Sequence, residues 1–305
     1  MGTPQFAVAS LNKLLSEKFD IVGIVTVPDK PQGRGQSVQA SPVKIAAQKY
    51  NLPILQPEKL KDERFIFSLK EFKPELIVVV AFRILPEEVF TIPPFGTINL
   101  HGSLLPKYRG AAPINRAIMN GEKETGATTF FIQKSVDTGN IIDMVKIPIT
   151  ENMTAGELHD IMAEKGAILL AQTCKKILTG NVETILQDNS LVTKAPKIHK
   201  DDCQINFNQP VETVHNFIRG LSPYPAAYTK LNDKTIKLFS SQVHDKKKIE
   251  FSPGTISKII NNQEFIIQCN PGLLSIKEVQ LEGKKRIGVG DFLRGFRNQT
   301  INFFG

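Results

Sequence analysis

The sequence predicts an α/β fold in which a doubly wound, mostly parallel sheet is followed by a smaller all-β domain of the barrel type. In the N-terminal part, short β-branched runs alternate with segments of helical spacing, which is typical of a parallel sheet covered by helices. From Lys230 onward the pattern changes to short strands at hairpin spacing. With 305 residues, 41% of them hydrophobic, the chain is long enough to bury two cores.

The N-terminal part supplies helices and buried strands in alternation. Residues 6–18 have helical spacing, and residues 20–27 are a β-branched run suited to a buried parallel strand. Residues 75–82, ELIVVVAF, are the most apolar run and are expected at the centre of the sheet. Further helices are expected over residues 43–50, 62–72 and 113–119, and short strands over residues 54–55 and 98–100.

Two strands and a long helix complete the first domain, which we expect over residues 1–193. Residues 125–133 and 140–148 alternate apolar and polar side chains, and residues 134–139 link them. A helix is expected over residues 154–177, because Thr154 and Glu157 form a capping-box pattern before an apolar stripe.

A basic, proline-bearing linker over residues 194–208 leads to a second domain over residues 209–305. In this domain we expect a helix over residues 211–221 and strands over residues 235–243, 254–260, 264–268 and 273–280.

Composition and charge narrow the functional class. The chain has no apolar run of about 18 residues and no signal-peptide pattern, so we expect a cytoplasmic protein without membrane contact. Three scattered cysteines and five histidines without an H-x-x-x-H pair argue against disulfides and against a metal site. A formal charge of +8 permits a polyanionic partner such as a nucleic acid, although a solvated basic face explains it equally well.

The stretch FGTINLHGSLLPKYRGAAP, residues 95–113, carries the clearest chemical signal. Its strand ends in Asn99 and His101, which face the same side because strand side chains alternate. An amide can donate to an oxygen that gains negative charge, an imidazole can move a proton, and a carboxylate is available downstream at Asp137. This set points to acyl transfer. Taken singly, the Asn-x-His pair could cap the loop and Asp137 could form a turn.

A wider set of motifs resembles the formyltransferase family that uses 10-formyltetrahydrofolate, especially its members that act on methionyl-tRNA. The motif N-x-H at residues 99–101 is followed by SLLPKYRGAAPI at 103–114 and by D-x-G at 137–139. The resemblance extends through MGTPQFAV at the start, PDKPQGRG at 28–35, SPVK at 41–44, LSPYPAAYT at 221–229 and LEGKKRIGVGDFLRG at 281–295. These motifs stand in the family's order and span nearly the full chain.

The resemblance implies a Rossmann-like formyltransferase domain, an OB-like C-terminal domain that helps to hold tRNA, and three groups of site residues. Asn99, His101 and Asp137 would be catalytic, with the amide and imidazole stabilising an oxyanion and the carboxylate orienting the imidazole. The cosubstrate 10-formyltetrahydrofolate would contact Arg83, Ile84, Leu85, Ser103, Leu104, Leu105 and Pro106. Initiator methionyl-tRNA would be held in part by the flexible, basic loop over residues 28–44, through Lys30, Arg34 and Lys44. If the resemblance is left aside, the alternative interpretation of Arg34 is a solvent-exposed charge on a loop.

The chain departs from the family at its start, where GTPQF resembles the turn after the first strand and no strand precedes it. We expect the natural gene product to supply that strand. The implied function is formyl transfer to methionyl-tRNA by a monomer. A formyltransferase acting on a small amine, such as glycinamide ribonucleotide or an amino sugar, would share the site chemistry, and a non-catalytic RNA-binding protein could keep the fold. The basic loop and the second domain favour a nucleic-acid acceptor.

Overall fold

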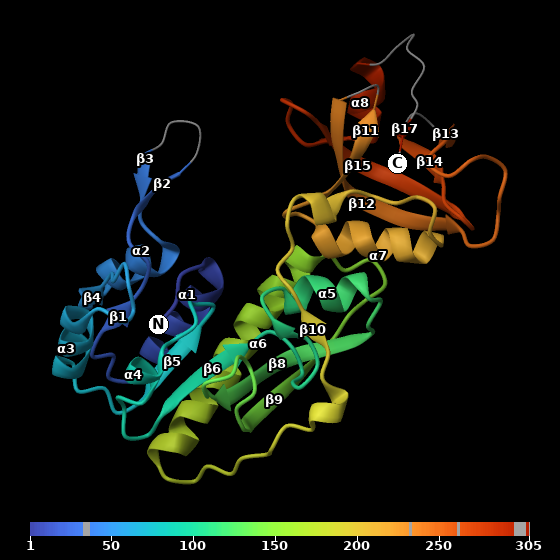
Figure 1. The fold of residues 1–305 in the computed structure, drawn as a ribbon. Coiled ribbons are helices and arrows are strands. Elements are labelled where there is room, and N and C mark those ends of the chain that lie inside the picture. Colours follow the sequence, from blue (N-terminus) through green and yellow to red (C-terminus); the bar gives the residue numbers. More distant parts are fainter. Residues whose placement is uncertain (33–36, 232–233, 261–262, 296–302, 305) are drawn as a thin grey trace. The chain divides into compact units, whose positions relative to one another are not determined.

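The structure is a computed structural model that describes residues 1–32, 37–231, 234–260, 263–295 and 303–304. The chain divides into two compact units, each assembled from segments that are separated in the sequence (Figure 1). The first unit contains residues 1–110, 125–147 and 159–194, and the second contains residues 111–124, 148–158 and 195–305.

The first unit is built on a mostly parallel sheet, as the alternation of strands and helices predicted. Strand β1 (Ile24–Val25) pairs in parallel with β4 (Ile54–Leu55). Strand β5 (Ile77–Val80) pairs in parallel with β6 (Thr97–His101), which pairs antiparallel with β8 (Glu124–Phe131). Strand β9 (Ile141–Pro148) follows β8 at the edge. The α/β fold class is therefore confirmed.

Met1 and Gly2 lie between β1 and β5 and are hydrogen-bonded to both. The Gly2 N–H donates to the Val25 carbonyl (3.1 Å), the Val80 N–H donates to the Met1 carbonyl (2.9 Å), and the Met1 amino group donates to the Val78 carbonyl (2.6 Å). Burial lowers the pKa of this amino group to about 5. A cavity of about 140 Å³ adjoins Met1 and Gly2. The strand that we expect upstream of Met1 stays a prediction.

Four predicted helices lie at or near their expected positions: α1 (Gln5–Ser16), α2 (Pro42–Lys49), α3 (Glu63–Glu71) and α6 (Ala155–Leu178). The short helix α4 (Glu87–Phe90) was not predicted. The predicted capping box of α6 is present, since the Thr154 hydroxyl accepts from the Glu157 N–H (3.2 Å) and the Glu157 carboxylate accepts from the Thr154 N–H (2.8 Å). Gly166 of α6 lies so close to β6 that an added Cβ would meet Leu100 at 3.1 Å. Leu100 therefore faces α6, and its neighbours Asn99 and His101 face the opposite side of the sheet.

The second unit has an antiparallel sheet, as predicted. Its strand order is β13 (Ile256–Ile260), β14 (Glu264–Gln268), β15 (Leu273–Leu281), β12 (Lys234–Asp245), β11 (Ala227–Leu231) and β17 (Phe303–Phe304), with β16 (Ile287–Gly288) beside β15. The pairings among the described residues form an open sheet and do not close it into a barrel. Helices α5 (Pro113–Met119), α7 (Val211–Leu221) and α8 (Val289–Gly295) belong to this unit, and α7 packs its apolar face on the core.

The basic loop over residues 28–44 is more regular than predicted. Strands β2 (Lys30–Gln32) and β3 (Ser37–Gln39) form an antiparallel ribbon in which Pro31 lies opposite Val38. The prediction of a flexible loop was wrong for these six residues. The loop was predicted because this segment is rich in Pro, Gly, Gln and Ser. A two-stranded ribbon has only edge strands, which tolerate a proline that a central strand would not. Short 3-10 helices occur at Asn189–Leu191 and Asp201–Cys203. No helix within the described ranges has the length and apolar character to span a bilayer.

Candidate active site

Strand β6 carries Asn99 and His101 on one face. In the register of the sheet, Asn99 lies between Val79 of β5 and Phe130 of β8, and His101 lies beside Thr128. His101 is buried, at 6% exposed, whereas Asn99 is partly exposed. Among the described residues the Asn99 side chain has no hydrogen-bond partner, so its amide is available to a ligand. The predicted placement of these two side chains on one face is confirmed.

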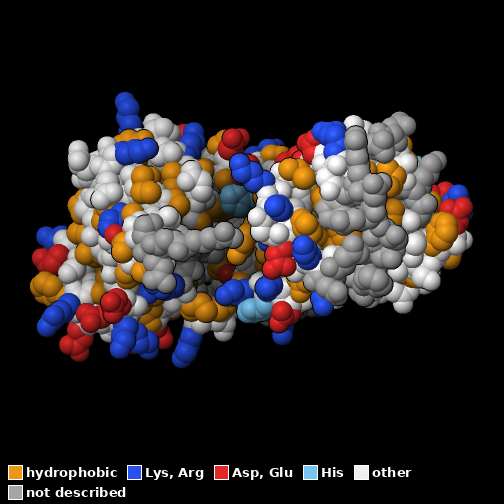
Figure 2. All heavy atoms as spheres, turned by 90° about the horizontal axis from the view of Figure 1, so that it is seen from above, with side chains coloured by type: hydrophobic (Ala, Val, Ile, Leu, Met, Phe, Trp, Pro, Cys, Tyr) orange, Lys and Arg blue, Asp and Glu red, His pale blue; other side chains and the backbone are white. Residues whose placement is uncertain are grey.

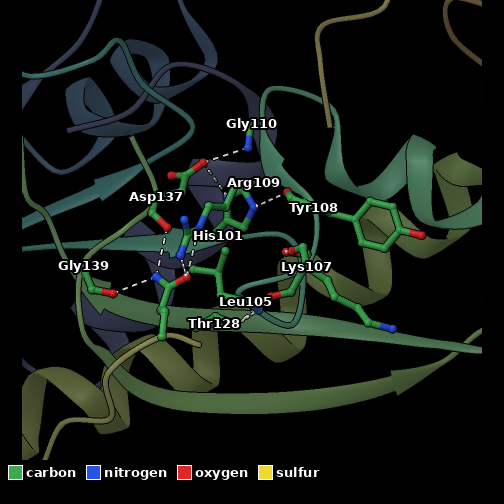
Figure 3. Close-up of polar contacts among 11 residues, drawn as sticks. His101, Leu105, Lys107, Tyr108, Arg109, Gly110, Thr128, Asp137 and Gly139 are labelled. Carbon is green, nitrogen blue, oxygen red and sulfur yellow. Dashed lines mark hydrogen bonds and ion pairs between the residues drawn. The ribbon is translucent and has the colours of Figure 1, made fainter. Parts of the chain in front are cut away.

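His101 is held at one ring nitrogen. Its Nε2 lies 2.9 Å from the carbonyl oxygen of Tyr108, and because a carbonyl only accepts, Nε2 carries the hydrogen (Figure 3). The other nitrogen, Nδ1, lies 3.8 Å from Asp137 Oδ2, which is longer than a hydrogen bond. His101 therefore has Nδ1 alone available for a substrate or for the carboxylate.

Asp137 reaches His101 from the loop between β8 and β9. Its Oδ2 accepts from the Gly110 N–H (2.9 Å), and its backbone is in the left-handed region, with φ +54°. Two residues on, an added Cβ at Gly139 would meet the Phe131 carbonyl at 1.6 Å, so the loop folds tightly back on β8. The D-x-G motif thus combines a partly buried carboxylate with a glycine that the close approach requires.

The loop after β6 is fixed by a threonine that sequence reasoning missed. Thr128 Oγ1 donates to the Ser103 carbonyl (2.6 Å) and accepts from the Leu105 N–H (3.1 Å), while Ser103 Oγ donates to the Lys107 carbonyl (2.6 Å). Ser103 and Leu105 are buried, whereas Leu104 and Pro106 are half-buried. The Ser103 hydroxyl is thus used within the loop. Thr128 lies in an ordinary strand pattern, and only its position opposite His101 reveals its role.

The turn after β5 holds the other three predicted folate contacts. The Arg83 guanidinium donates to the carbonyls of Pro57 and Glu58 (2.8 Å each), so it braces the turn. Ile84 is 73% exposed and Leu85 is buried. The turn therefore offers backbone groups and an exposed apolar side chain, while its charged group is already engaged.

The predicted tRNA contacts have unequal surroundings. Lys30 is exposed on β2. Lys44 Nζ lies 2.5 Å from Asp29 Oδ2, and this pair, with the Gln56 amide, holds the pKa of the Asp29 carboxyl below its usual value. Arg34 lies outside the described residues. The structure thus brings Asn99, His101 and Asp137 together, and leaves Lys30 as the freely exposed cation of the two described lysines.

Within the described residues, no group of three or more His, Cys, Asp or Glu side chains is arranged so that it could hold a metal ion. Burial raises the pKa of Cys174 and of Cys269 to about 12, which keeps both thiols protonated and unreactive near neutral pH. At this face of the sheet, Asn99, His101 and Asp137 provide an amide, an imidazole and a carboxylate.

Comparison with known proteins gives consistent results. The sequence model described as Formyl transferase matches residues 1–174, and that of the Formyl transferase C-terminal domain matches residues 197–297. A methionyl-tRNA formyltransferase from Bacteroides thetaiotaomicron is 46% identical over 306 residues, covering 97% of this chain and 94% of the relative. Another, from Acetivibrio thermocellus, is 43% identical, covering 97% and 96%.

Among solved structures, a sugar 3N-formyl transferase, crystallised in the presence of dTDP and 5-N-formyl-THF, superposes with a TM-score of 0.66 at 25% identity, covering 93% of this chain and 97% of that one. HypX from Aquifex aeolicus, in complex with tetrahydrofolic acid, shares the fold with a TM-score of 0.62 at 15% identity, over 93% of this chain and 51% of that one. Since two family models match in order and close relatives align over nearly the full length, the chain belongs to the formyl transferase family, among the methionyl-tRNA formyltransferases.

Proposed function

We propose that this protein transfers the formyl group of 10-formyltetrahydrofolate to the free amino group of initiator methionyl-tRNA. The observation that carries the proposal is the convergence of Asn99, His101 and Asp137 at the end of β6. The 43–46% identity to methionyl-tRNA formyltransferases along nearly the full chain supports this acceptor.

In this reaction, the amine nitrogen bonds to the formyl carbon, the bond from that carbon to the folate nitrogen breaks, and a proton passes overall from the amine to the leaving nitrogen. Asn99 donates its amide N–H to the oxygen that becomes negatively charged. His101 donates or accepts through Nδ1, because Nε2 is engaged by the Tyr108 carbonyl. Asp137 orients a protonated His101 and accepts the amine's proton, directly or through a water.

The formyl donor binds as a substrate, and its candidate contacts lie in the turn after β5 and in the loop after β6. The turn with Arg83, Ile84 and Leu85 offers backbone groups beside the exposed Ile84 side chain. The segment from Ser103 to Pro106 is fixed from behind by Thr128, so its backbone is preorganised. We assign donor binding to these two segments.

The acceptor tRNA is bound by basic residues, for which we retain Lys30, Arg34 and Lys44. In the second unit, Lys246, Lys248 and Arg286 are already paired with Glu212, Glu250 and Glu278. On the face drawn in Figure 2, Lys and Arg side chains lie among Asp and Glu side chains. Such interspersed charges favour phosphate contacts at several points over one continuous basic patch.

The domain bounds, the oligomeric state and the cellular location are proposed from the sequence. We assign catalysis to residues 1–193, a linker to residues 194–208 and an OB-like tRNA-binding domain to residues 209–305. We also propose that the protein acts as a monomer in the cytoplasm.

An amino sugar is the second candidate acceptor, because the sugar 3N-formyl transferase shares the fold at 25% identity. Radiolabelled formyl donor should be incubated with equal amounts of methionyl-tRNA, glycinamide ribonucleotide and a dTDP-linked amino sugar. We expect label on methionyl-tRNA at a kcat/KM far above that for either small amine. Label mainly on a small amine would overturn the proposed acceptor, and label on no acceptor would overturn the proposed function.

A further inference from the structure

Gln187 lies in the extended segment after α6 and is buried, at 6% exposed. Its Oε1 accepts from Nε (3.0 Å) and Nη2 (2.6 Å) of Arg109, and its Nε2 donates to the carbonyls of Asp137 (2.9 Å) and Gly139 (2.7 Å). All four hydrogen-bonding positions of the amide are therefore filled. Its orientation is fixed, because a flipped amide would turn its oxygen toward two carbonyls.

The carbonyl groups that Gln187 binds flank the strained part of the D-x-G loop. Asp137 has a left-handed backbone, which costs a non-glycine residue free energy and persists only where the surroundings hold it. The amide of Gln187 provides such a hold at both ends of the motif. The adjoining backbone pairing of Ile185 with Ile141 (2.8 Å in both directions) keeps the segment in register with β9.

The other partner of Gln187, Arg109, belongs to the segment that holds the rest of the site. The Tyr108 carbonyl binds His101 Nε2, and the Gly110 N–H binds Asp137 Oδ2. This segment is also hydrogen-bonded to Thr193. The Tyr108 N–H donates to Thr193 Oγ1 (2.8 Å), and the Arg109 N–H donates to the Thr193 carbonyl (2.9 Å). Next along the chain, the short strand β7 (Arg109–Gly110) pairs with β10 (Lys194–Ala195). Figure 3 shows the contacts of His101 with Tyr108 and of Asp137 with Gly110.

We propose that Gln187 is a positioning residue for formyl transfer, which joins the Asp137 loop to the segment that holds His101. This inference rests on the proposed function. Gln187 touches no reacting atom itself. It sets the distance between the Asp137 carboxylate and His101 Nδ1 by holding the two backbone segments to one side chain.

Two substitutions separate this role from a simple partnership with Arg109. In Gln187→Glu, a carboxylate would keep the contact with Arg109, but its second oxygen would face the carbonyls of Asp137 and Gly139 and repel them. In Gln187→Ala both halves of the contact are lost. If Gln187 served only to pair with Arg109, the glutamate variant would be at least as active as the wild type.

The test measures formyl transfer to methionyl-tRNA by Gln187→Ala, Gln187→Glu, Asp137→Asn and the double variant Gln187→Ala/Asp137→Asn. We expect kcat to fall about 10- to 100-fold in both Gln187 variants, as for a misplacement of about 1 Å, with little change in either KM. Because Gln187 acts through Asp137, the double variant should be no slower than Asp137→Asn. The control is Thr173→Val, which removes a buried hydroxyl bonded to Asp143 and Thr129 elsewhere in the same unit and should keep wild-type kcat.

Amide hydrogen exchange gives a readout that does not depend on activity. The Gly110 N–H should exchange faster in Gln187→Ala than in the wild type or Thr173→Val, because its acceptor, the Asp137 carboxylate, is released. Wild-type kcat in the Gln187 variants, losses that multiply in the double variant, or unchanged exchange at Gly110 would overturn the inference. If the wild type itself transfers no formyl group, the proposed function fails, and the exchange at Gly110 still decides whether Gln187 holds the loop.

Discussion

At His101, the structure leaves one ring nitrogen for chemistry. Nε2 is committed to the Tyr108 carbonyl, so the imidazole meets substrate and Asp137 through Nδ1. Strand alternation was enough to predict that Asn99 and His101 share a face. The groups that fix the site, the Tyr108 carbonyl and the Gly110 N–H, belong to the backbone and have no signature in a sequence. Gln187 was missed for a similar reason, since it lies 50 residues from Asp137 and nothing local marks it.

Thr128 gives a prediction at the same scale. Thr128→Val keeps the side-chain volume but leaves the Ser103 carbonyl and the Leu105 N–H without their partner, at a cost of about 1–3 kcal/mol for each buried group. We expect KM for the formyl donor to rise and the melting temperature to fall. Thr129→Val is the matched control, because the adjacent hydroxyl faces the other side of β8 and bonds Thr173. It should lower the melting temperature without raising KM, and equal KM values in the two variants would contradict the role of Thr128.

Among the secondary-structure elements, those with strong local signals were predicted most closely. Helix α6 has its capping box at Thr154, and α5 begins at Pro113 as predicted. Strands β2 and β3 were missed, because the prolines and glycines of this segment indicate a loop and the strands form only by pairing with each other. Strand β1 is shorter than its β-branched run, since pairing with β4 involves two residues of each strand. Elements that depend on a distant partner are the ones that sequence patterns miss.

The loop between β8 and β9 gives a prediction at Gly139. In Gly139→Ala the new methyl group would meet the Phe131 carbonyl at 1.6 Å, so the loop must move and carry Asp137 with it. We expect kcat to fall at least about tenfold, as displacement of a catalytic group does. Gly295→Ala is the control, because an added Cβ there meets nothing within 4 Å. Comparable turnover in both variants would show that the close approach does not position Asp137.

Helix α7 gives a pH prediction. His215, 3% exposed, has Nδ1 2.9 Å from Ser241 Oγ and donates from Nε2 to the Glu151 carbonyl (3.2 Å), and burial lowers its pKa. The unfolded chain, in which histidine has a pKa of about 6.5, therefore binds more protons than the folded protein below that pH. The free energy of unfolding should fall as the pH drops below about 6.5. Melting temperatures between pH 7.5 and 5 should show a shallower decline in His215→Gln, and identical slopes would exclude His215 as a cause.

For the whole molecule, the charge balance is the property that most concerns a tRNA substrate. The formal charge is +8, and the chain from Asp201 onward has 14 lysines and arginines against 10 acidic residues. Several of these cations are paired, so composition overstates the charge that is free to meet phosphates. Motif order was enough to predict the family. The assembly of each unit from separated segments could not be predicted, because it depends on packing between distant elements.

Salt dependence tests this electrostatic part. We expect the affinity for methionyl-tRNA to fall steeply with salt, and Lys30→Ala and Arg34→Ala each to reduce the slope of log K against log salt by about 1. Donor binding should be unaffected. Lys248→Ala, which breaks a pair with Glu250, is the control and should leave the slope unchanged. Unaltered slopes in Lys30→Ala and Arg34→Ala would remove both residues from the tRNA-binding surface.

The turnover number for formyl transfer to methionyl-tRNA, measured in Asn99→Ala, His101→Ala and Asp137→Ala, tests the central claim most directly. Loss of one donor to a developing oxyanion typically costs about 100- to 1000-fold, so we expect each variant to fall by that order while circular dichroism and melting temperature show a folded protein. A loss below about tenfold in all three folded variants would contradict the account, because the convergence of these side chains would then have no part in the reaction.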